Sequence, residues 1–218
     1  MNMVQLAKYI DHTLLKPEAL EKDIIKLCNE ALRYDFATVC INPSHVVIAA
    51  KLLKDSNVKV CTVIGFPLGA NTTAVKIFET ENSIKNGAQE IDMVINIGKF
   101  KEKNFFYVEK EISEISKVCQ GSAKLKVIIE TCLLEQDEII KACEIVKVSG
   151  ADFIKTSTGF STAGAKVSDI ALMKSVLGES IGIKASGGIR DYETAMEMIN
   201  AGATRIGASA SVKICEGK

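Results

Sequence analysis

The 218-residue sequence lacks several features that would point to particular classes of protein. It has no tryptophan, three prolines and two histidines, and its 27 basic residues balance its 27 acidic ones. A chain without net charge has no overall field that would attract nucleic acid or an anionic membrane, so neither is expected as a partner. No apolar run reaches the length of a membrane span. The N-terminal segment MNMVQLAKYIDH also lacks a signal-peptide core, because Lys8 and Asp11 interrupt it.

Patterns for disulfides and metal ions are missing as well. The seven cysteines are scattered and form no Cys-x-x-Cys pair, a pattern typical of reduced thiols in a cytoplasmic protein. The histidines, His12 and His45, are far apart and belong to no cluster with metal-ligand spacing. We therefore expect a cytoplasmic protein with no metal and no cofactor.

The chain shows no sign of a domain boundary. It has no Gly/Ser-rich linker and no run of one charge, so residues 1–218 are predicted to form one domain. Short β-rich runs alternate with segments of helical periodicity, which favours βαβ units and a parallel sheet. The predicted strands are 10–14, 37–41, 58–64, 90–95, 125–130, 152–156, 181–185 and 204–207. The predicted helices are 18–33, 43–54, 71–86, 104–119, 135–149, 167–177 and 191–201.

Eight strands and seven clear helices predict an α/β fold of the (β/α)8 TIM-barrel type. The main alternative is a doubly wound open sheet, which predicts a glycine-rich turn after the first strand. The segment IDHTLLKPEAL has no glycine, which favours the barrel. Gly87, Gly150 and Gly202 each precede a predicted strand, where they are expected to end a helix in the left-handed conformation.

Four charged residues lie inside apolar strand segments, toward the strand ends where barrel active sites are found. They are Asp11, Asp92, Lys155 and Lys184. Structural salt bridges could explain any one of them. Two lysines on consecutive strands are harder to explain in that way, because an unpaired buried cation is costly. The four residues are therefore predicted to form a site, and His12 could line its mouth beside Asp11.

The two lysines suggest covalent chemistry. Neighbouring strands lie about 4.8 Å apart, and two ammonium groups at about 5 Å repel by about 3 kcal/mol at an effective dielectric near 20. Such repulsion would lower the pKa of one amine and make it nucleophilic, as an imine-forming lysine requires. One lysine would attack a carbonyl and the other would tune it.

Glycines and hydroxyls follow the last strands. Gly159 comes after Lys155, Gly187 and Gly188 come after Lys184, and Gly207 and Ser209 lie at the end of the chain's last strand. Barrels often bind phosphate with the loops after strands seven and eight. These residues are predicted to bind a phosphate, with Ser209 capping a short helix.

In combination, several segments resemble the deoxyribose-phosphate aldolases over nearly the whole chain. They are IDHTLL, ATVCINP, GFPLGANTTAVK, EIDMVINIG, LKVIIETCLL, FIKTSTGF, IKASGGIR and RIGAS. The resemblance implies a class I aldolase that reversibly cleaves 2-deoxy-D-ribose 5-phosphate into D-glyceraldehyde 3-phosphate and acetaldehyde. It implies also a phosphosugar and acetaldehyde as the ligands, and suggests a homodimer.

Carried over by position, Lys155 is similar to the Schiff-base lysine of that family and Lys184 to its second lysine. Asp92 resembles the acid/base partner and Asp11 a supporting aspartate. The chain departs from some members at Phe160, where they have a lysine, and at Ala210, where they have a serine. Arg190 could replace part of the missing positive charge.

Two other functions remain open at this point. A lysine-dependent aldolase with a different carbonyl donor would show the same lysine chemistry. A non-catalytic phosphosugar-binding barrel would bind ligand without turnover.

Overall fold

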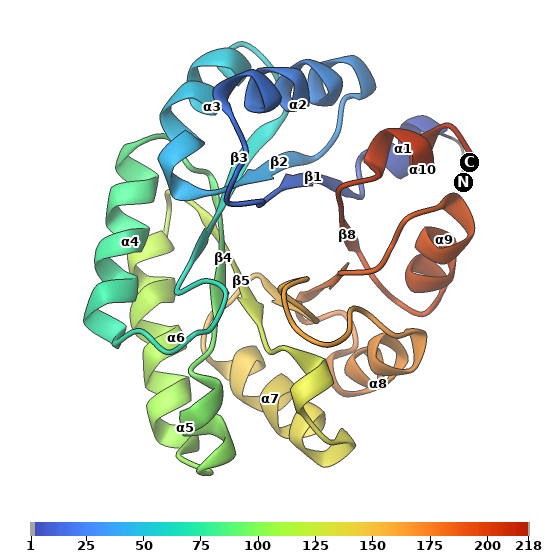
Figure 1. Ribbon diagram of the computed structural model, residues 1–218. Helices are drawn as coiled ribbons and strands as arrows, with labels where there is room; N and C mark the ends of the chain where they lie inside the picture. The colour runs from blue at the N-terminus through green and yellow to red at the C-terminus, as the bar shows by residue number, and fades with distance from the viewer. Residues whose placement is uncertain (1–2, 218) are drawn as a thin grey trace.

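The computed structural model describes residues 3–217, and its eight strands form one closed parallel barrel in the order β1 to β8. Figure 1 looks into this barrel and shows the helices around its outside. The predicted (β/α)8 architecture is therefore confirmed. The strands are β1 (Ile10–Leu14), β2 (Thr38–Ile41), β3 (Lys59–Ile64), β4 (Glu90–Val94), β5 (Lys124–Ile128), β6 (Phe153–Lys155), β7 (Gly182–Ser186) and β8 (Arg205–Ala208).

The seven predicted helices are all present, and their ends differ by a few residues at most from the expected ones. They are α2 (Glu21–Tyr34), α3 (Val46–Leu53), α4 (Thr73–Lys85), α6 (Phe105–Cys119), α7 (Gln136–Val148), α8 (Val167–Leu177) and α9 (Tyr192–Asn200). The other elements span about one turn each. They are α1 (Met3–Ala7), α5 (Ile97–Lys101), α10 (Ser211–Cys215), η1 (Pro43–His45) and η2 (Thr131–Leu133). Of these, η1 lies within the predicted helix 43–54 and α10 is the short helix expected after Ser209.

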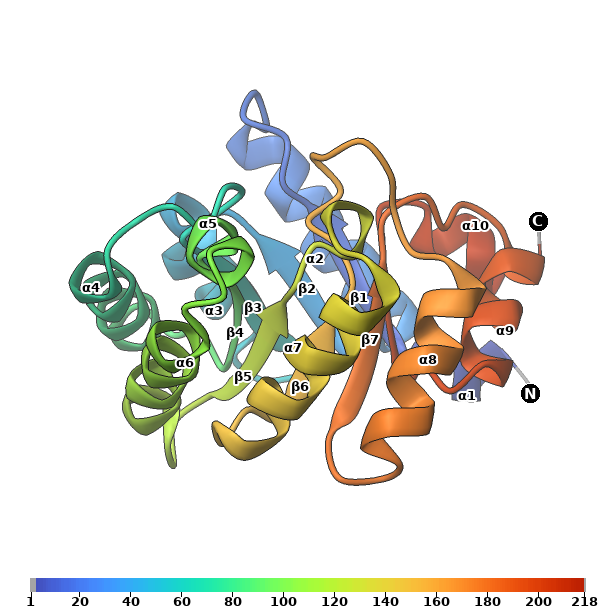
Figure 2. The same ribbon diagram turned by 90° about the horizontal axis from the view of Figure 1, so that it is seen from below.

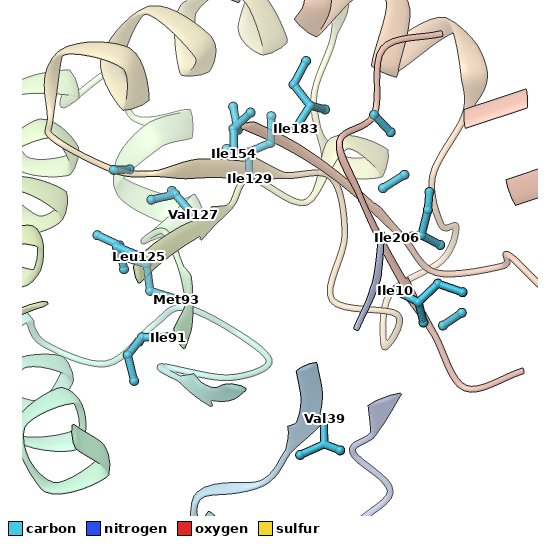
Figure 3. Close-up of a cluster of buried hydrophobic side chains, with 14 of the residues drawn as sticks. Ile10, Val39, Ile91, Met93, Leu125, Val127, Ile129, Ile154, Ile183 and Ile206 are labelled. Carbon is cyan, nitrogen blue, oxygen red and sulfur yellow. The ribbon is translucent and has the colours of Figure 1, made fainter. Parts of the chain in front are cut away.

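Side chains alternate between the two faces of each strand, and the apolar set faces the helices. On β4, Ile91 and Met93 are fully buried in the main hydrophobic core, while the carboxylates of Glu90 and Asp92 take part in ion pairs inside the barrel. Figure 3 shows members of this core from several strands, including Ile154 and Ile206. Full burial of such a side chain contributes about 1.5–3 kcal/mol. The packing under the helices therefore stabilises the barrel and fixes which residues point inward.

The glycines expected to end helices have the predicted backbone conformation. Gly87, Gly150 and Gly202 have φ values of 108°, 80° and 118°, a region that side-chain-bearing residues rarely adopt. Each lies shortly before a strand, so the turn reverses the chain and returns it to the barrel.

The segments that follow the strands project at one end of the barrel. In Figure 2 the segment between β1 and α2 (blue) and the segment between β6 and α8 (orange) rise at the same end. Among the described residues, no helix has the length and apolar character that crossing a bilayer requires.

Candidate active site

Lys155 and Lys184 converge on one carboxylate oxygen inside the barrel. They are register partners on the neighbouring strands β6 and β7. The Nζ atom of each lysine lies 2.7 Å from Oδ2 of Asp92, which comes from β4. The three residues predicted from strand positions thus meet at one point.

Asp11 on β1 connects the second lysine to Arg205 on the neighbouring strand β8. Its Oδ2 lies 2.5 Å from Nζ of Lys184, and its Oδ1 accepts a 2.6 Å hydrogen bond from Nη1 of Arg205. The side chains of Asp11, Asp92 and Lys184 are completely buried. Asp11 and Asp92 therefore both contact the Lys184 ammonium.

Three further charged side chains belong to the same network and were missed in the sequence. Lys126 lies 2.8 Å from Oδ1 of Asp92 and 2.6 Å from Oε2 of Glu90, and Arg205 lies 2.9 Å from that same Glu90 oxygen. Each occupies an inward position in an apolar strand, as Glu90 does two residues before Asp92. The period-two alternation that singled out Asp92 could have found all three.

The network contains four cations and three carboxylates. Burial alone lowers the pKa of Lys184, but the carboxylates of Asp11 and Asp92 outweigh this effect and hold the pKa above its ordinary value. Burial likewise raises the pKa of Asp92, but Lys126, Lys155 and Lys184 hold it well below the usual range. The repulsion calculated from two lysines alone was therefore incomplete, because a shared carboxylate lies between them.

Cys61 adds a thiol to this network. Its Sγ donates to Oδ1 of Asp92 at 3.1 Å and accepts from Nζ of Lys126 at 3.1 Å. The thiol of Cys40 and the carboxylate of Asp92 lie close to the same sulfur, within the spacing of metal ligands. A cation there would compete with Lys126, whose ammonium is already within hydrogen-bonding distance of Asp92 and Cys61. The donor set is thus neutralised by protein cations.

A cavity of about 380 Å³ opens above the network, a size typical of small-ligand sites. Lys155 lies in its lining, as do all five residues predicted to bind phosphate: Gly159, Gly187, Gly188, Gly207 and Ser209. The side chain of Lys184 also packs closely against Gly207, since a Cβ at Gly207 would lie 3.0 Å from Cε of Lys184. The predicted cap was wrong, because the N-cap residue of α10 is Ala210 and not Ser209.

Glu130 anchors the loop after Lys155. One of its carboxylate oxygens accepts a 2.5 Å hydrogen bond from the hydroxyl of Thr158, and the Thr158 backbone N–H donates to the same carboxylate at 3.2 Å. Glu130 is buried and adopts a left-handed backbone conformation with φ of 53°. It therefore holds Thr158 and the adjoining Gly159 at the cavity wall.

Comparison with known proteins shows the family of this chain. A family model described as "DeoC/LacD family aldolase" matches residues 5–217. The chain belongs to the DeoC/LacD aldolase family. A deoxyribose-phosphate aldolase of Clostridium perfringens is 62% identical over 218 residues, which cover 100% of this chain and 97% of that protein. One from Clostridium tetani is 58% identical and covers 98% of this chain and 99% of its own.

A solved structure from the same family has the same fold. The deoxyribose phosphate aldolase of Aeropyrum pernix, described as a unique tetramer, superposes with a TM-score of 0.92 at 35% identity. The match covers 99% of this chain and 91% of that one.

In this aldolase, His12 does not lie beside Asp11. Its Nε2 is 2.9 Å from Oε2 of Glu30 on α2, so the imidazole faces the helix layer. Adjacent residues of a strand point to opposite faces, and the inward position of Asp11 therefore directs His12 outward.

Proposed function

We propose that this aldolase reversibly cleaves 2-deoxy-D-ribose 5-phosphate into D-glyceraldehyde 3-phosphate and acetaldehyde through a Schiff base on Lys155. The single observation that supports this most strongly is the pair of lysines on one Asp92 oxygen, at the floor of a cavity. Family membership and the high identity to deoxyribose-phosphate aldolases support the substrate.

Lys155 is the proposed nucleophile because of its position in the network. Of the four cations, it alone lines the cavity, and it contacts one carboxylate where Lys184 contacts two. A neutral amine is the form that adds to a carbonyl.

In the cleavage direction, the Lys155 amine adds to C1 of the open-chain sugar, and loss of water gives a protonated imine. Removal of the proton from the C3 hydroxyl then breaks the C2–C3 bond, and the imine accepts the electron pair as an enamine. D-Glyceraldehyde 3-phosphate leaves at this step. Protonation of the enamine carbon and hydrolysis release acetaldehyde and restore the amine.

Asp92 and Lys184 are proposed to move the protons in these steps. Asp92 Oδ2 lies 2.7 Å from both amines, and Lys184 is itself held by Asp11. If Asp92 has this role, the variant Asp92→Asn should lose most of its turnover while retaining its fold, and near-normal turnover would remove Asp92 from the mechanism.

The phosphate is proposed to lie against Gly159, Gly187, Gly188, Gly207 and Ser209. Glycine-rich loops let backbone N–H groups approach a phosphate closely. A fixed phosphate also holds the reacting carbons in register with the lysine amine.

A cytoplasmic homodimer is proposed as the working state. All seven cysteines lie among the described residues as free thiols, which fits a reducing compartment. The dimer is proposed from the resemblance to the deoxyribose-phosphate aldolases. Light scattering coupled to size-exclusion chromatography measures the mass directly, and the mass of a monomer or of a tetramer would contradict the dimer.

The decisive test is borohydride trapping with acetaldehyde, followed by peptide mass mapping. We expect a reduced ethyl adduct on Lys155 that is absent from Lys155→Ala and present in Lys166→Ala, a control in the loop that follows. Trapping instead with pyruvate or dihydroxyacetone phosphate would indicate a different carbonyl donor. No adduct on the folded protein would refute the Schiff base and favour a non-catalytic phosphosugar-binding barrel.

A further inference from the structure

The charged side chains around the cavity are all cationic. Lys16, Lys155 and Arg190 line it, and no carboxylate of the described residues does. Lys155 is the proposed nucleophile, which leaves Lys16 and Arg190 as the other two charged residues that line the cavity. Lys16 was not singled out in the sequence, where it stands in the segment between the first strand and the first long helix.

The barrel order places these two cations on either side of the proposed phosphate position. Strand β8 contains Gly207 and is followed directly by Ser209. It is hydrogen-bonded to β7 on one side and to β1 on the other. Arg190 belongs to the segment after β7 and Lys16 to the segment after β1. A phosphate at the end of β8 therefore has one cation from each neighbouring strand.

Phe160 also lines the cavity and supplies no charge. Phe160 packs edge-on against Phe66, with ring centroids 5.3 Å apart and an interplanar angle of 86°. Phe160 stands at the position where the resemblance leads one to expect a lysine. A phosphate monoester carries about 1.5–2 negative charges at pH 7, so one arginine alone does not balance it.

Lys16 is free to take this part. It is exposed, and its ammonium makes no ion pair with any residue in the range 3–217. Lys26 is also exposed, but it has an ion partner and does not line the cavity above the network. It lies 3.8 Å from Glu30 and lines only a neighbouring hollow of about 390 Å³ that Lys16 also borders.

We infer that Lys16 is a specificity-determining residue that binds the substrate phosphate from the β1 side and replaces the positive charge missing at Phe160. The inference rests on the proposed function, since it assigns a residue to the phosphate of the same substrate. It predicts that Lys16 discriminates phosphorylated from unphosphorylated sugar and takes no part in bond cleavage.

The test compares 2-deoxyribose 5-phosphate with 2-deoxyribose in the full chain. In Lys16→Gln, the ratio of the two kcat/KM values should fall about ten-fold, equivalent to about 1.4 kcal/mol, through a higher KM for the phosphorylated sugar. Lys16→Arg should restore most of that ratio. Lys26→Gln is the matched control and should keep the wild-type ratio. An equal ratio in Lys16→Gln and Lys26→Gln would overturn the inference.

Calorimetric titration with inorganic phosphate separates this inference from the proposed function. We expect the Kd for phosphate to rise about ten-fold in Lys16→Gln and to stay at the wild-type value in Lys26→Gln. If the wild type binds phosphate but releases no acetaldehyde from the sugar, the proposed function fails. The difference in phosphate Kd between the wild type and Lys16→Gln still tests whether Lys16 binds the phosphate. A phosphate Kd that is the same in the wild type and Lys16→Gln would refute the role of Lys16.

Discussion

Lys126 provides a sharp test of the buried charge network. Its ammonium is completely buried and lies 2.6 Å from Glu90, 2.8 Å from Asp92 and 3.6 Å from Asp11. Replacement by methionine keeps most of the volume and removes the charge. It leaves Glu90 with Arg205 as its remaining close cation and deprives Asp92 Oδ1 of its ammonium partner.

Removal of one partner of a buried ion pair costs about 3–5 kcal/mol, because the other charge remains buried without compensation. We expect Lys126→Met to lose about this much free energy of unfolding. For a domain of this size, each kcal/mol shifts the Tm by about 2–4 °C, so the expected loss is about 6–20 °C.

Lys124→Met is the matched control, since Lys124 lies on the same strand two residues earlier and is exposed. Its ammonium lies 5.9 Å from the centre of the Phe153 ring, a cation–π contact worth about 0.5–1 kcal/mol. Far-UV circular dichroism suits the measurement, because the chain has no tryptophan to report unfolding by fluorescence. Equal Tm values for the two variants would refute the reasoning.

Three other predictions follow from the same contacts. Burial raises the pKa of Asp11, but Lys184, Lys126 and Arg205 outweigh burial and lower it. The ionised Asp11 carboxylate therefore contributes stability above the unfolded pKa of 3.8, and this contribution is lost as the pH falls below it. Urea titrations should show that Asp11→Asn is less stable than the wild type at pH 7 and that its free energy of unfolding falls less steeply between pH 4 and 3. In Gly207→Ala, a methyl group 3.0 Å from Lys184 Cε should cost about 1–3 kcal/mol of stability and reduce kcat, and unchanged values of both would contradict the close contact. Glu130→Gln weakens the charge-assisted bonds to Thr158 and should cost about 1.5–3 kcal/mol by thermal unfolding, whereas an unaltered Tm would mean that this anchor adds nothing.

Local sequence patterns determined the strands and long helices because these elements are set by short-range periodicity. Alternating apolar residues such as Ile91 and Met93 marked the strand faces, and glycines such as Gly87 marked the turns. Short elements such as α1 and α5 were missed, since their five residues span too few turns for a period to be recognised. Four of the seven members of the charge network were predicted for a related reason, as charged residues near the ends of apolar strands.

The sequence by itself determined the eight alternating units, the two adjacent lysines and the glycine loops, because each of these depends on a few consecutive residues. Only the tertiary structure decided which charged side chains contact the same carboxylate oxygen. Closing the barrel brings β1 beside β8 and points β4, β5, β6 and β7 at one interior, so that Lys126, Glu90 and Arg205 join Asp92 and the lysines. That closure depends on contacts between residues as much as 194 positions apart, as between Asp11 and Arg205, and no local pattern records them.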